Sequence, residues 1–169
     1  SVKINLRDII FYNKSELLNI TKYTQLAIFC SSMSIFNVLK NEIGIDKLSI
    51  NFSLGHSLGE YTALTASNVI SIEDCTMLLK IRGELMQGAF KENMSGMVAI
   101  IGLDCTKVEK IITDNKLKVE IANDNSPLQV VISGTNEDLL KAENVIIKNG
   151  AKKFIYLNVS SAFHSRLMK

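Results

Sequence analysis

Apolar residues recur at helical spacing over two long stretches in the first half of the chain. In residues 24–43 the apolar side chains fall three and four positions apart, and Gly44 follows as a stop signal. A second helix is predicted from Ser71-x-x-Asp74, a looser form of the capping box. Between the two, alternating apolar residues predict a buried strand over Leu48–Phe52, and a further helix is predicted from Leu58 to about Ser67.

The second half of the chain has a different texture, with short segments separated by turn residues. The predicted order is strand, helix, strand, strand, helix, strand: residues 97–103, 106–114, 118–122, 129–133, 136–148 and 152–159. Asn, Asp, Ser and Pro predict a turn over residues 123–127. This βαββαβ order is typical of a ferredoxin-like subdomain. We therefore expect a small subdomain over residues 95–158, inserted into a larger unit of residues 1–94 and 159–169.

The composition is that of a globular protein. Of 169 residues, 47% are hydrophobic and 21% are charged. The net charge of +2 gives no electrostatic reason to expect nucleic acid as a partner. The longest apolar stretch, residues 26–39, is too short to cross a membrane. Three widely spaced cysteines predict neither a disulfide framework nor a zinc site, and they fit an intracellular compartment.

The pentapeptide Gly55-His56-Ser57-Leu58-Gly59 is a G-x-S-x-G motif between the predicted strand and the predicted helix. That context is the one a nucleophile elbow requires, in which a sharp turn exposes a serine Oγ. We expect both glycines to be necessary, because a Cβ two residues either side of the serine would collide across so tight a turn. The N–H of Leu58, at the start of the helix, is a candidate oxyanion donor.

Arg82 breaks the pattern of the helix that follows. It projects from the apolar stripe, four residues after Leu78 and seven after Cys75. A guanidinium at such a position is costly unless it is paired. One interpretation is a structural arginine that reaches a buried carboxylate or the edge of the helix. The other is an anion clamp, because the planar fork of the guanidinium binds a carboxylate through two hydrogen bonds.

A serine nucleophile requires a base, and the chain has two histidines. His56 adjoins Ser57, and adjacent side chains on a sharp turn diverge, so we interpret His56 as a packing residue of the elbow. His164 lies in a loop just after a predicted strand and is the candidate base. Three acidic residues lie between the serine and His164 in the chain, and none stands out as an orienting group: Asp124, Asp138 and Glu143.

Four motifs, in this order, resemble those of malonyl-CoA:acyl-carrier-protein transacylases. They are G-H-S-L-G-E-Y at residues 55–61, R-G-x-x-M-Q at 82–87, N-x-N-S-P-x-Q-V-V-I-S-G at 123–134 and A-F-H at 162–164. The similarity covers nearly the whole chain. It implies a partial α/β-hydrolase-like core with an inserted ferredoxin-like subdomain. The implied activity, in fatty acid biosynthesis, moves malonyl from coenzyme A to a serine and then to the phosphopantetheine thiol of acyl carrier protein.

The resemblance assigns a role to each matched residue. Ser57 is implied to be the nucleophile, His164 the base and Arg82 the clamp on the malonyl carboxylate. The N–H of Leu58 would supply half of the oxyanion hole. The ping-pong reaction of the family needs no metal and no redox cofactor, so none is expected here.

Phe163, before the histidine, matches the malonyl-selecting form of the motif, because methylmalonyl-selecting members carry serine there. Met86, one helical turn from Arg82, would line the same pocket. The family's N-terminal Gly-Gln-Gly strand, which supplies the second oxyanion N–H, has no counterpart here. The C-terminal part, with the carbonyl that orients the histidine, has none either. The resemblance therefore implies an internal fragment lacking both ends, and we expect these residues alone to be inactive.

The complete protein is expected to be a monomer that binds a coenzyme A thioester and acyl carrier protein, with no nucleic acid or membrane partner. The expected location is a bacterial cytoplasm, a plastid- or apicoplast-type organelle, or a mitochondrion. Three other functions fit parts of the sequence. An acyltransferase module of a polyketide or fatty-acid synthase would share the motifs. A serine esterase or thioesterase would need an acidic triad member. A non-catalytic acyl-carrier-binding module would not need the serine, histidine and arginine together.

Overall fold

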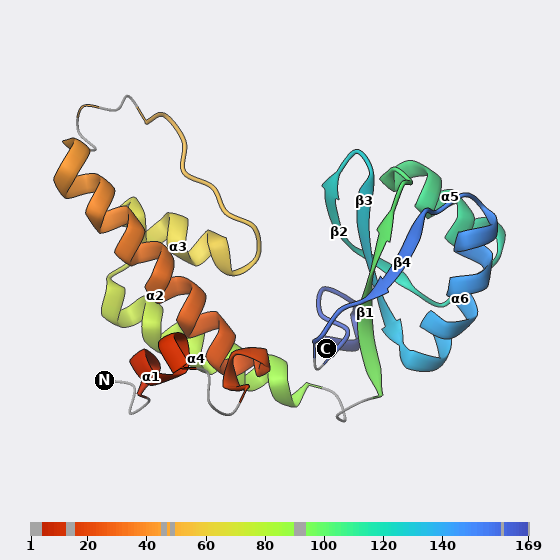
Figure 1. Ribbon diagram of the computed structural model, residues 1–169, viewed down its shortest axis with the longest axis horizontal. Helices are drawn as coiled ribbons and strands as arrows, with labels where there is room; N and C mark the ends of the chain where they lie inside the picture. Colours follow the sequence, from red (N-terminus) through yellow and green to blue (C-terminus); the bar gives the residue numbers. More distant parts are fainter. Residues whose placement is uncertain are drawn as a thin grey trace. The chain divides into compact units, whose positions relative to one another are not determined.

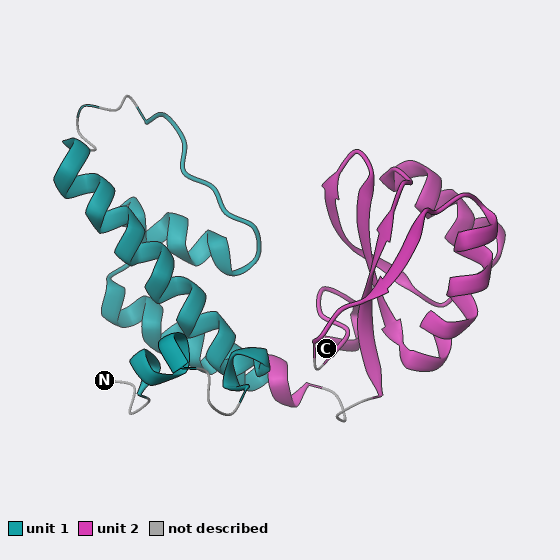
Figure 2. Cartoon of the chain, in the orientation of Figure 1, with its two compact units in different colours: residues 1–85 teal, residues 86–169 magenta. Residues whose placement is uncertain are grey.

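The computed structural model describes residues 5–12, 16–44, 47, 50–89, 94–159 and 161–168. The chain divides into two compact units, Ser1–Leu85 and Met86–Lys169 (Figure 2). Residues 159–169 group with the second unit, whereas the sequence-based division assigns them to the first domain. The predicted domain limits of 1–94 with 159–169, and of 95–158, stay a prediction.

The first unit is built from helices. They are α1 (Leu6–Tyr12), α2 (Thr21–Leu39), α3 (Leu58–Ala66) and α4 (Ile72–Gly88), with a short 3₁₀ turn at Leu17–Asn19 (Figure 1). The predicted long helix is confirmed in α2, which continues into a π turn over Lys40–Gly44 and ends with Gly44 at φ +76°. The predicted cap of α4 is also confirmed, because Ser71 Oγ accepts a hydrogen bond from the Asp74 N–H at 3.0 Å.

Side chains of α2, α3 and α4 meet in one apolar cluster: Leu26, Phe29, Met33, Leu58, Cys75 and Leu79. The helices α2 and α4 approach closely at Gly83, where a Cβ would stand 2.8 Å from the Cα of Lys22. Only a glycine allows so close a contact between two backbones. This packing holds the start of α3 and the middle of α4 in one unit, and the two elements carry Ser57 and Arg82.

The strand predicted before the elbow is wrong for the residues that the structure describes. Residues 50–55 form no strand, and residues 48 and 49 lie outside the described part. The apolar side chains of Ile50, Phe52 and Leu54 are exposed. A strand requires a hydrogen-bonded neighbour, and no strand is present in the described residues of the first unit. The alternation therefore marks a segment with an apolar face, without a partner strand in this part of the chain.

The second unit is a four-stranded antiparallel sheet with two helices. Its elements are β1 (Ser95–Ile101), α5 (Cys105–Asp114), β2 (Glu120–Ser126), β3 (Gln129–Thr135), α6 (Asn136–Lys148) and β4 (Lys153–Tyr156). The strand order in the sheet is β2-β3-β1-β4. The predicted order of strands and helices is confirmed. The predicted turn over residues 123–127 is wrong in its extent, because β2 continues to Ser126.

The edge strand β2 explains that error. Its ladder with β3 is irregular, with register shifts between Ile121 and Asn123 and between Asp124 and Ser126. Bulges of this kind admit Asn and Asp, residues that are otherwise typical of turns, into a strand at the edge of a sheet. The pairing with β3 therefore decides the conformation, and only Pro127 and Leu128 remain in the turn.

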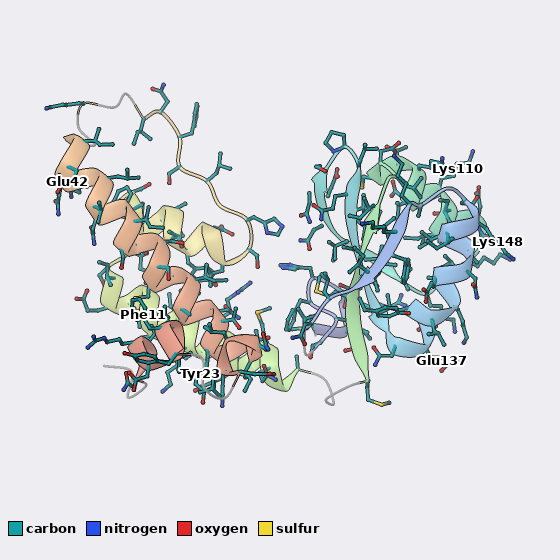
Figure 3. All side chains as sticks on the ribbon, viewed as in Figure 1. Phe11, Tyr23, Glu42, Lys110, Glu137 and Lys148 are labelled. Carbon is teal, nitrogen blue, oxygen red and sulfur yellow. The ribbon has the colours of Figure 1, made fainter. Side chains whose placement is uncertain are left out.

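Alternation along the central strands gives the sheet two apolar faces. Val98, Ile100, Val130 and Ile132 face α5 and α6 and form the larger cluster. Figure 1 shows the two helices on one side of the sheet and the C-terminal segment on the other. Charged side chains of the helices project away from the sheet: Lys110, Glu137 and Lys148 (Figure 3). The opposite face carries Met97, Ala99 and Val131, and Phe163 packs on it.

Candidate functional site

Ser57 stands at the N-terminus of α3 in a strained backbone conformation. Its φ is 52° and its ψ is −110°, outside the regions that residues with a Cβ ordinarily adopt. The side chain does not cap the helix, so Oγ is not engaged with the backbone N–H groups that follow. A serine with a strained backbone and a hydroxyl that does not cap its own helix is typical of a nucleophile elbow.

The two glycines of the motif differ in what the backbone requires of them. A Cβ on Gly55 would lie 1.9 Å from the carbonyl carbon of Gly59 and 2.5 Å from the N of Glu60. A Cβ on Gly59 would meet no atom within 4 Å. The prediction that the turn requires glycine is confirmed for Gly55 and wrong for Gly59. The chain folds back on Gly55, while Gly59 already lies inside α3.

The Leu58 N–H begins α3. The next two N–H groups are engaged, since that of Gly59 donates to the His56 carbonyl at 2.8 Å and that of Glu60 to the Ser57 carbonyl at 3.2 Å. No acceptor for the Leu58 N–H occurs among the described residues. A helix N-terminus with a vacant N–H stabilises negative charge beside it. The N–H of Leu58, in the residue next to Ser57, is thus able to donate a hydrogen bond to an oxyanion.

Arg82, on α4, contacts the serine of the elbow. Its Nη2 donates a hydrogen bond to Ser57 Oγ at 2.8 Å, and its Nη1 donates to Oε1 of Gln25. Its guanidinium carbon also lies 5.5 Å from the centre of the Tyr61 ring, within the range of a cation–π contact. Within the described part of the chain, no carboxylate lies at ion-pair distance from Arg82. The positive charge is therefore fixed at the serine without a matching negative charge.

Gln25 is a residue of the site that sequence reasoning missed. It is buried on α2 and supplies the acceptor that orients one arm of the guanidinium. A glutamine in the middle of an apolar helix face was the available signal, because a buried amide must find a hydrogen-bond partner. His56 is exposed, so it is not the packing residue that we expected.

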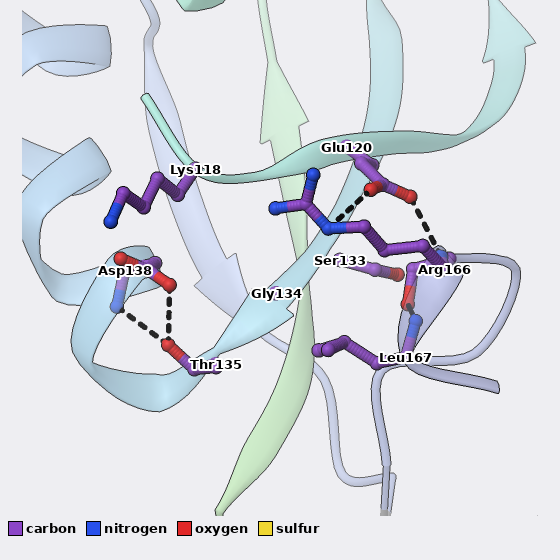
Figure 4. Close-up of a pocket in the computed structure, with 9 residues that line it drawn as sticks. Lys118, Glu120, Ser133, Gly134, Thr135, Asp138, Arg166 and Leu167 are labelled. Atoms are coloured by element: carbon purple, nitrogen blue, oxygen red, sulfur yellow. Dashed lines mark hydrogen bonds and ion pairs between the residues drawn. The ribbon is translucent and has the colours of Figure 1, made fainter. Parts of the chain in front are cut away.

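In the second unit, a tight turn presents His164. Ala162 and Phe163 are buried, whereas His164 is exposed and has a left-handed backbone with φ 57°. After the turn, Arg166 is tied to β2, because its backbone N–H donates to Oε2 of Glu120 at 2.9 Å and its Nε lies 3.1 Å from Oε1 (Figure 4). The imidazole is thus carried at the surface of a turn that is held on both sides.

Phe163 fills the face of the sheet opposite to the helices. Its ring packs with Met97, Ala99 and Val131, and Met86, the first residue of the second unit, is partly buried against the same cluster. The three acidic residues considered as orienting groups have other positions. Asp124 is exposed on β2, Asp138 accepts a hydrogen bond from Thr135 Oγ1, and Glu143 accepts one from Tyr156 Oη.

The predicted site residues therefore fall into two groups. Ser57, Leu58 and Arg82 are brought together in the first unit, and Met86, Phe163 and His164 belong to the second. No group of three or more His, Cys, Asp or Glu side chains is placed to hold a metal ion among the residues that the structure describes. In those same ranges no helix has the length and apolar character needed to span a membrane.

Comparison with known proteins adds a family to this geometry. The family model described as "Acyl transferase domain" matches residues 1–169. The chain is 37% identical over 172 residues to the malonyl CoA-acyl carrier protein transacylase of Bacillus subtilis, covering 100% of this chain and 53% of that protein. A crystal structure of an acyl-carrier-protein S-malonyltransferase from Bartonella henselae is 41% identical with a TM-score of 0.86, covering 96% of this chain and 52% of that one.

A third relative is a malonyl-transacylase solved in complex with a type II PKS acyl-carrier protein. It is 36% identical with a TM-score of 0.84, over 96% of this chain and 52% of that chain. The chain spans about half the length of the relatives that it matches. The structural relatives have an α/β fold, as does this chain.

Proposed function

Because the chain belongs to the acyl transferase domain family, whose model matches residues 1–169, we propose that it carries the reaction centre of a malonyl-CoA:acyl-carrier-protein transacylase. Ser57 is the nucleophile and His164 is the base. Arg82 binds the free carboxylate of malonyl, and the N–H of Leu58 is one donor of the oxyanion hole. A dyad of this kind needs the histidine to accept the proton of the serine hydroxyl.

The reaction runs in two balanced halves. The Oγ of Ser57 attacks the thioester carbonyl of malonyl-CoA, His164 takes the hydroxyl proton, and the carbonyl oxygen becomes an oxyanion beside the Leu58 N–H. The C–S bond then breaks, and the coenzyme A thiolate leaves with the proton from His164. In the second half, the phosphopantetheine thiol of acyl carrier protein gives its proton to His164 and its sulfur attacks the malonyl ester. The bond between the acyl carbon and Ser57 Oγ then breaks, and Oγ takes the proton back from His164. This cycle uses no metal and no redox cofactor.

One observation carries the proposal: the positive charge of Arg82 stands at Ser57 Oγ without a carboxylate partner in the described residues. An ester or thioester of a simple acid has no use for such a charge. An acyl group that ends in a carboxylate does, because a guanidinium binds it through two parallel hydrogen bonds. Malonyl is such a group. An unspecific esterase would carry an apolar wall at this position.

The remaining assignments belong to the same proposal. Phe163 and Met86 limit the acyl pocket, which favours malonyl over branched acyl groups.

Residues 95–158 form a ferredoxin-like subdomain, supported by the strand order β2-β3-β1-β4, and the rest belongs to an α/β-hydrolase-like core. The protein partner is acyl carrier protein, as in the relative solved with its carrier. The complete enzyme acts as a monomer inside a bacterial cell or an organelle of the plastid, apicoplast or mitochondrial type.

The proposal is tested by incubating the full-length protein with labelled malonyl-CoA and mapping the acylated residue by mass spectrometry. We expect one malonyl group, on Ser57, and its transfer to added holo acyl carrier protein. Ser57→Ala is the control and should take up no label. Label on another residue, or none in the unmodified protein, would contradict the proposal.

A further inference from the structure

Two buried serines of the sheet, Ser95 and Ser133, contact the turn that carries His164. Ser133 Oγ donates a hydrogen bond to the Phe163 carbonyl at 2.6 Å, and Ser95 Oγ accepts one from the Ala162 N–H at 3.1 Å. Both residues are almost wholly buried, with 1% of the surface of Ser133 and 4% of that of Ser95 exposed. The two bonds link residues that are far apart in the sequence, so the contact is tertiary.

The serines belong to the face of the sheet that is otherwise apolar. Ser133 lies opposite Met97 in the ladder between β1 and β3, and Ser95 is two residues before Met97 on the same strand. A hydroxyl buried among apolar side chains costs free energy unless it is hydrogen-bonded. On this face the two hydroxyls form hydrogen bonds with the backbone of residues 162 and 163. They therefore attach the turn to the sheet and do not bond within the sheet itself.

The bond from Ser133 acts on the peptide group that joins Phe163 to His164. That group is planar, so a fixed Phe163 oxygen also fixes the N of His164 and the direction of its Cα. His164 needs such support, because its left-handed backbone is unfavourable for a residue with a Cβ. Ser165 adds a third bond, from its Oγ to the Ala162 carbonyl at 2.6 Å. After His164, the ion pair between Glu120 and Arg166 holds the other end of the turn on β2 (Figure 4).

We infer that Ser133, assisted by Ser95, is a positioning residue for His164: its hydroxyl fixes the Phe163–His164 peptide and so sets where the imidazole is held. This rests on the proposed function only in giving His164 the role of base. The alternative is that the serines attach the C-terminal segment to the sheet and have no effect on the histidine. The two differ in what happens to the imidazole when one hydroxyl is removed.

The test uses the full-length protein carrying ¹³C-labelled histidine. The His164 signal is identified with a His164→Asn variant and followed by NMR without substrate. In Ser133→Ala we expect the signal to shift and broaden, because the ring samples several positions. The kcat for acylation of Ser57 should fall about 10- to 100-fold, the usual cost of misplacing a catalytic group by about 1 Å. The KM for malonyl-CoA should not change, because Arg82 still binds the carboxylate.

Ser133→Cys keeps a weaker donor of similar size. Its His164 signal and its kcat should lie between those of the wild type and those of Ser133→Ala. Thr113→Val is the matched control, because it removes an exposed hydroxyl of the same unit that donates to the Glu109 carbonyl at 2.9 Å. It should leave the His164 signal and kcat as they were. Ser95→Ala serves as a second test, with a smaller change of the same kind, if Ser133→Ala does not fold.

A wild-type His164 signal and a wild-type kcat in Ser133→Ala would overturn the inference. So would an equal loss in Thr113→Val, because removal of any hydroxyl from this unit would then suffice. If the unmodified protein places no malonyl on Ser57, the proposed function fails. The histidine signal needs no substrate, so it still decides whether Ser133 positions the ring.

Discussion

The guanidinium of Arg82 donates a hydrogen bond from Nη2 to the Oγ of Ser57 at 2.8 Å. This hydrogen bond occupies one of the two acceptor lone pairs of the hydroxyl and draws electron density from Oγ. If Ser57 is the nucleophile, as proposed, Oγ should attack a thioester more readily once the guanidinium has moved to another acceptor. The carboxylate of a malonyl group is a stronger acceptor than a hydroxyl and can draw it away. Binding of the correct acyl group would thus release the nucleophile, whereas an acetyl group offers nothing in exchange.

Arg82→Ala should lose its preference for malonyl over acetyl. The transition-state stabilisation measured by kcat/KM for malonyl-CoA should fall by about 2–4 kcal/mol, the loss expected when a partly buried charged contact to the substrate is removed. Acetyl-CoA turnover should change little or rise, because Oγ is no longer engaged. The control is Arg7→Ala, which removes an exposed arginine of the same unit. Equal losses for malonyl and acetyl would show that Arg82 has a structural role only.

Gln25 should determine how firmly Arg82 is held. Gln25→Ala removes the acceptor of Nη1. We expect kcat/KM for malonyl-CoA to fall by an amount equal to about 1 kcal/mol of transition-state stabilisation, the net value of one hydrogen bond. Gln25→Glu should lower it further, because its carboxylate pairs with the guanidinium and competes with that of malonyl. Steady-state kinetics with malonyl-CoA and acetyl-CoA measure both changes. A Gln25→Glu protein with the malonyl preference of the wild type would contradict this account.

The elements of the second unit were predictable from the sequence because their periodicity reports which side chains face the core. The spacing of Leu139, Ala142 and Ile146 marks the buried side of α6, and the alternation of β1 and β3 marks two faces. The pairing of one strand with another depends on residues far apart in the sequence, so a local pattern does not report it. The sequence therefore misplaced the end of β2, and it predicted a strand at residues 50–52, where no partner strand is present among the described residues.

The site divides in the same way. Ser57 and Arg82 were predictable because each breaks a local rule, a serine between two glycines and a charge in an apolar stripe. Gln25, Ser95 and Ser133 were not, because a polar residue in a helix or strand is ordinary until its partner is known. Their partners lie 57, 67 and 30 residues away. Only the fold brings such pairs together.

The two glycines of the elbow offer a direct test of the turn geometry. Gly55→Ala places a Cβ 2.0 Å from the Gly59 carbonyl oxygen, so we expect a loss of about 3 kcal/mol in the free energy of unfolding, as for severe overpacking. Gly59→Ala meets no atom and replaces a glycine inside α3. It should stabilise the protein by about 0.5 kcal/mol. Chemical denaturation of both variants measures the difference, and equal effects of the two would contradict the geometry.

Cys75 and Cys30 should differ in reactivity, because one is buried and the other is exposed. Cys75 is fully buried between α3 and α4, and its Sγ lies 3.7 Å from the Tyr61 carbonyl, whereas Cys30 is exposed. Burial raises the pKa of the Cys75 thiol, and a hydrogen bond with Thr65 opposes this only in part. Since the thiolate is the reactive form, iodoacetamide should modify Cys30 quickly and Cys75 only upon unfolding. Mass spectrometry of tryptic peptides separates the two sites.

The raised pKa of Cys75 also determines how the free energy of unfolding changes with pH. The folded state holds the Cys75 proton more tightly than the unfolded state, so between the two pKa values folding takes up a proton. The contribution of the thiol is then complete below the ordinary value of 9.0 and is lost as the pH rises through the raised pKa. The free energies of unfolding of the wild type and of Cys75→Ala should therefore converge above pH 9.0. Denaturation curves at pH 7, 9 and 10 measure this, and a constant difference would mean that the thiol ionises equally in both states.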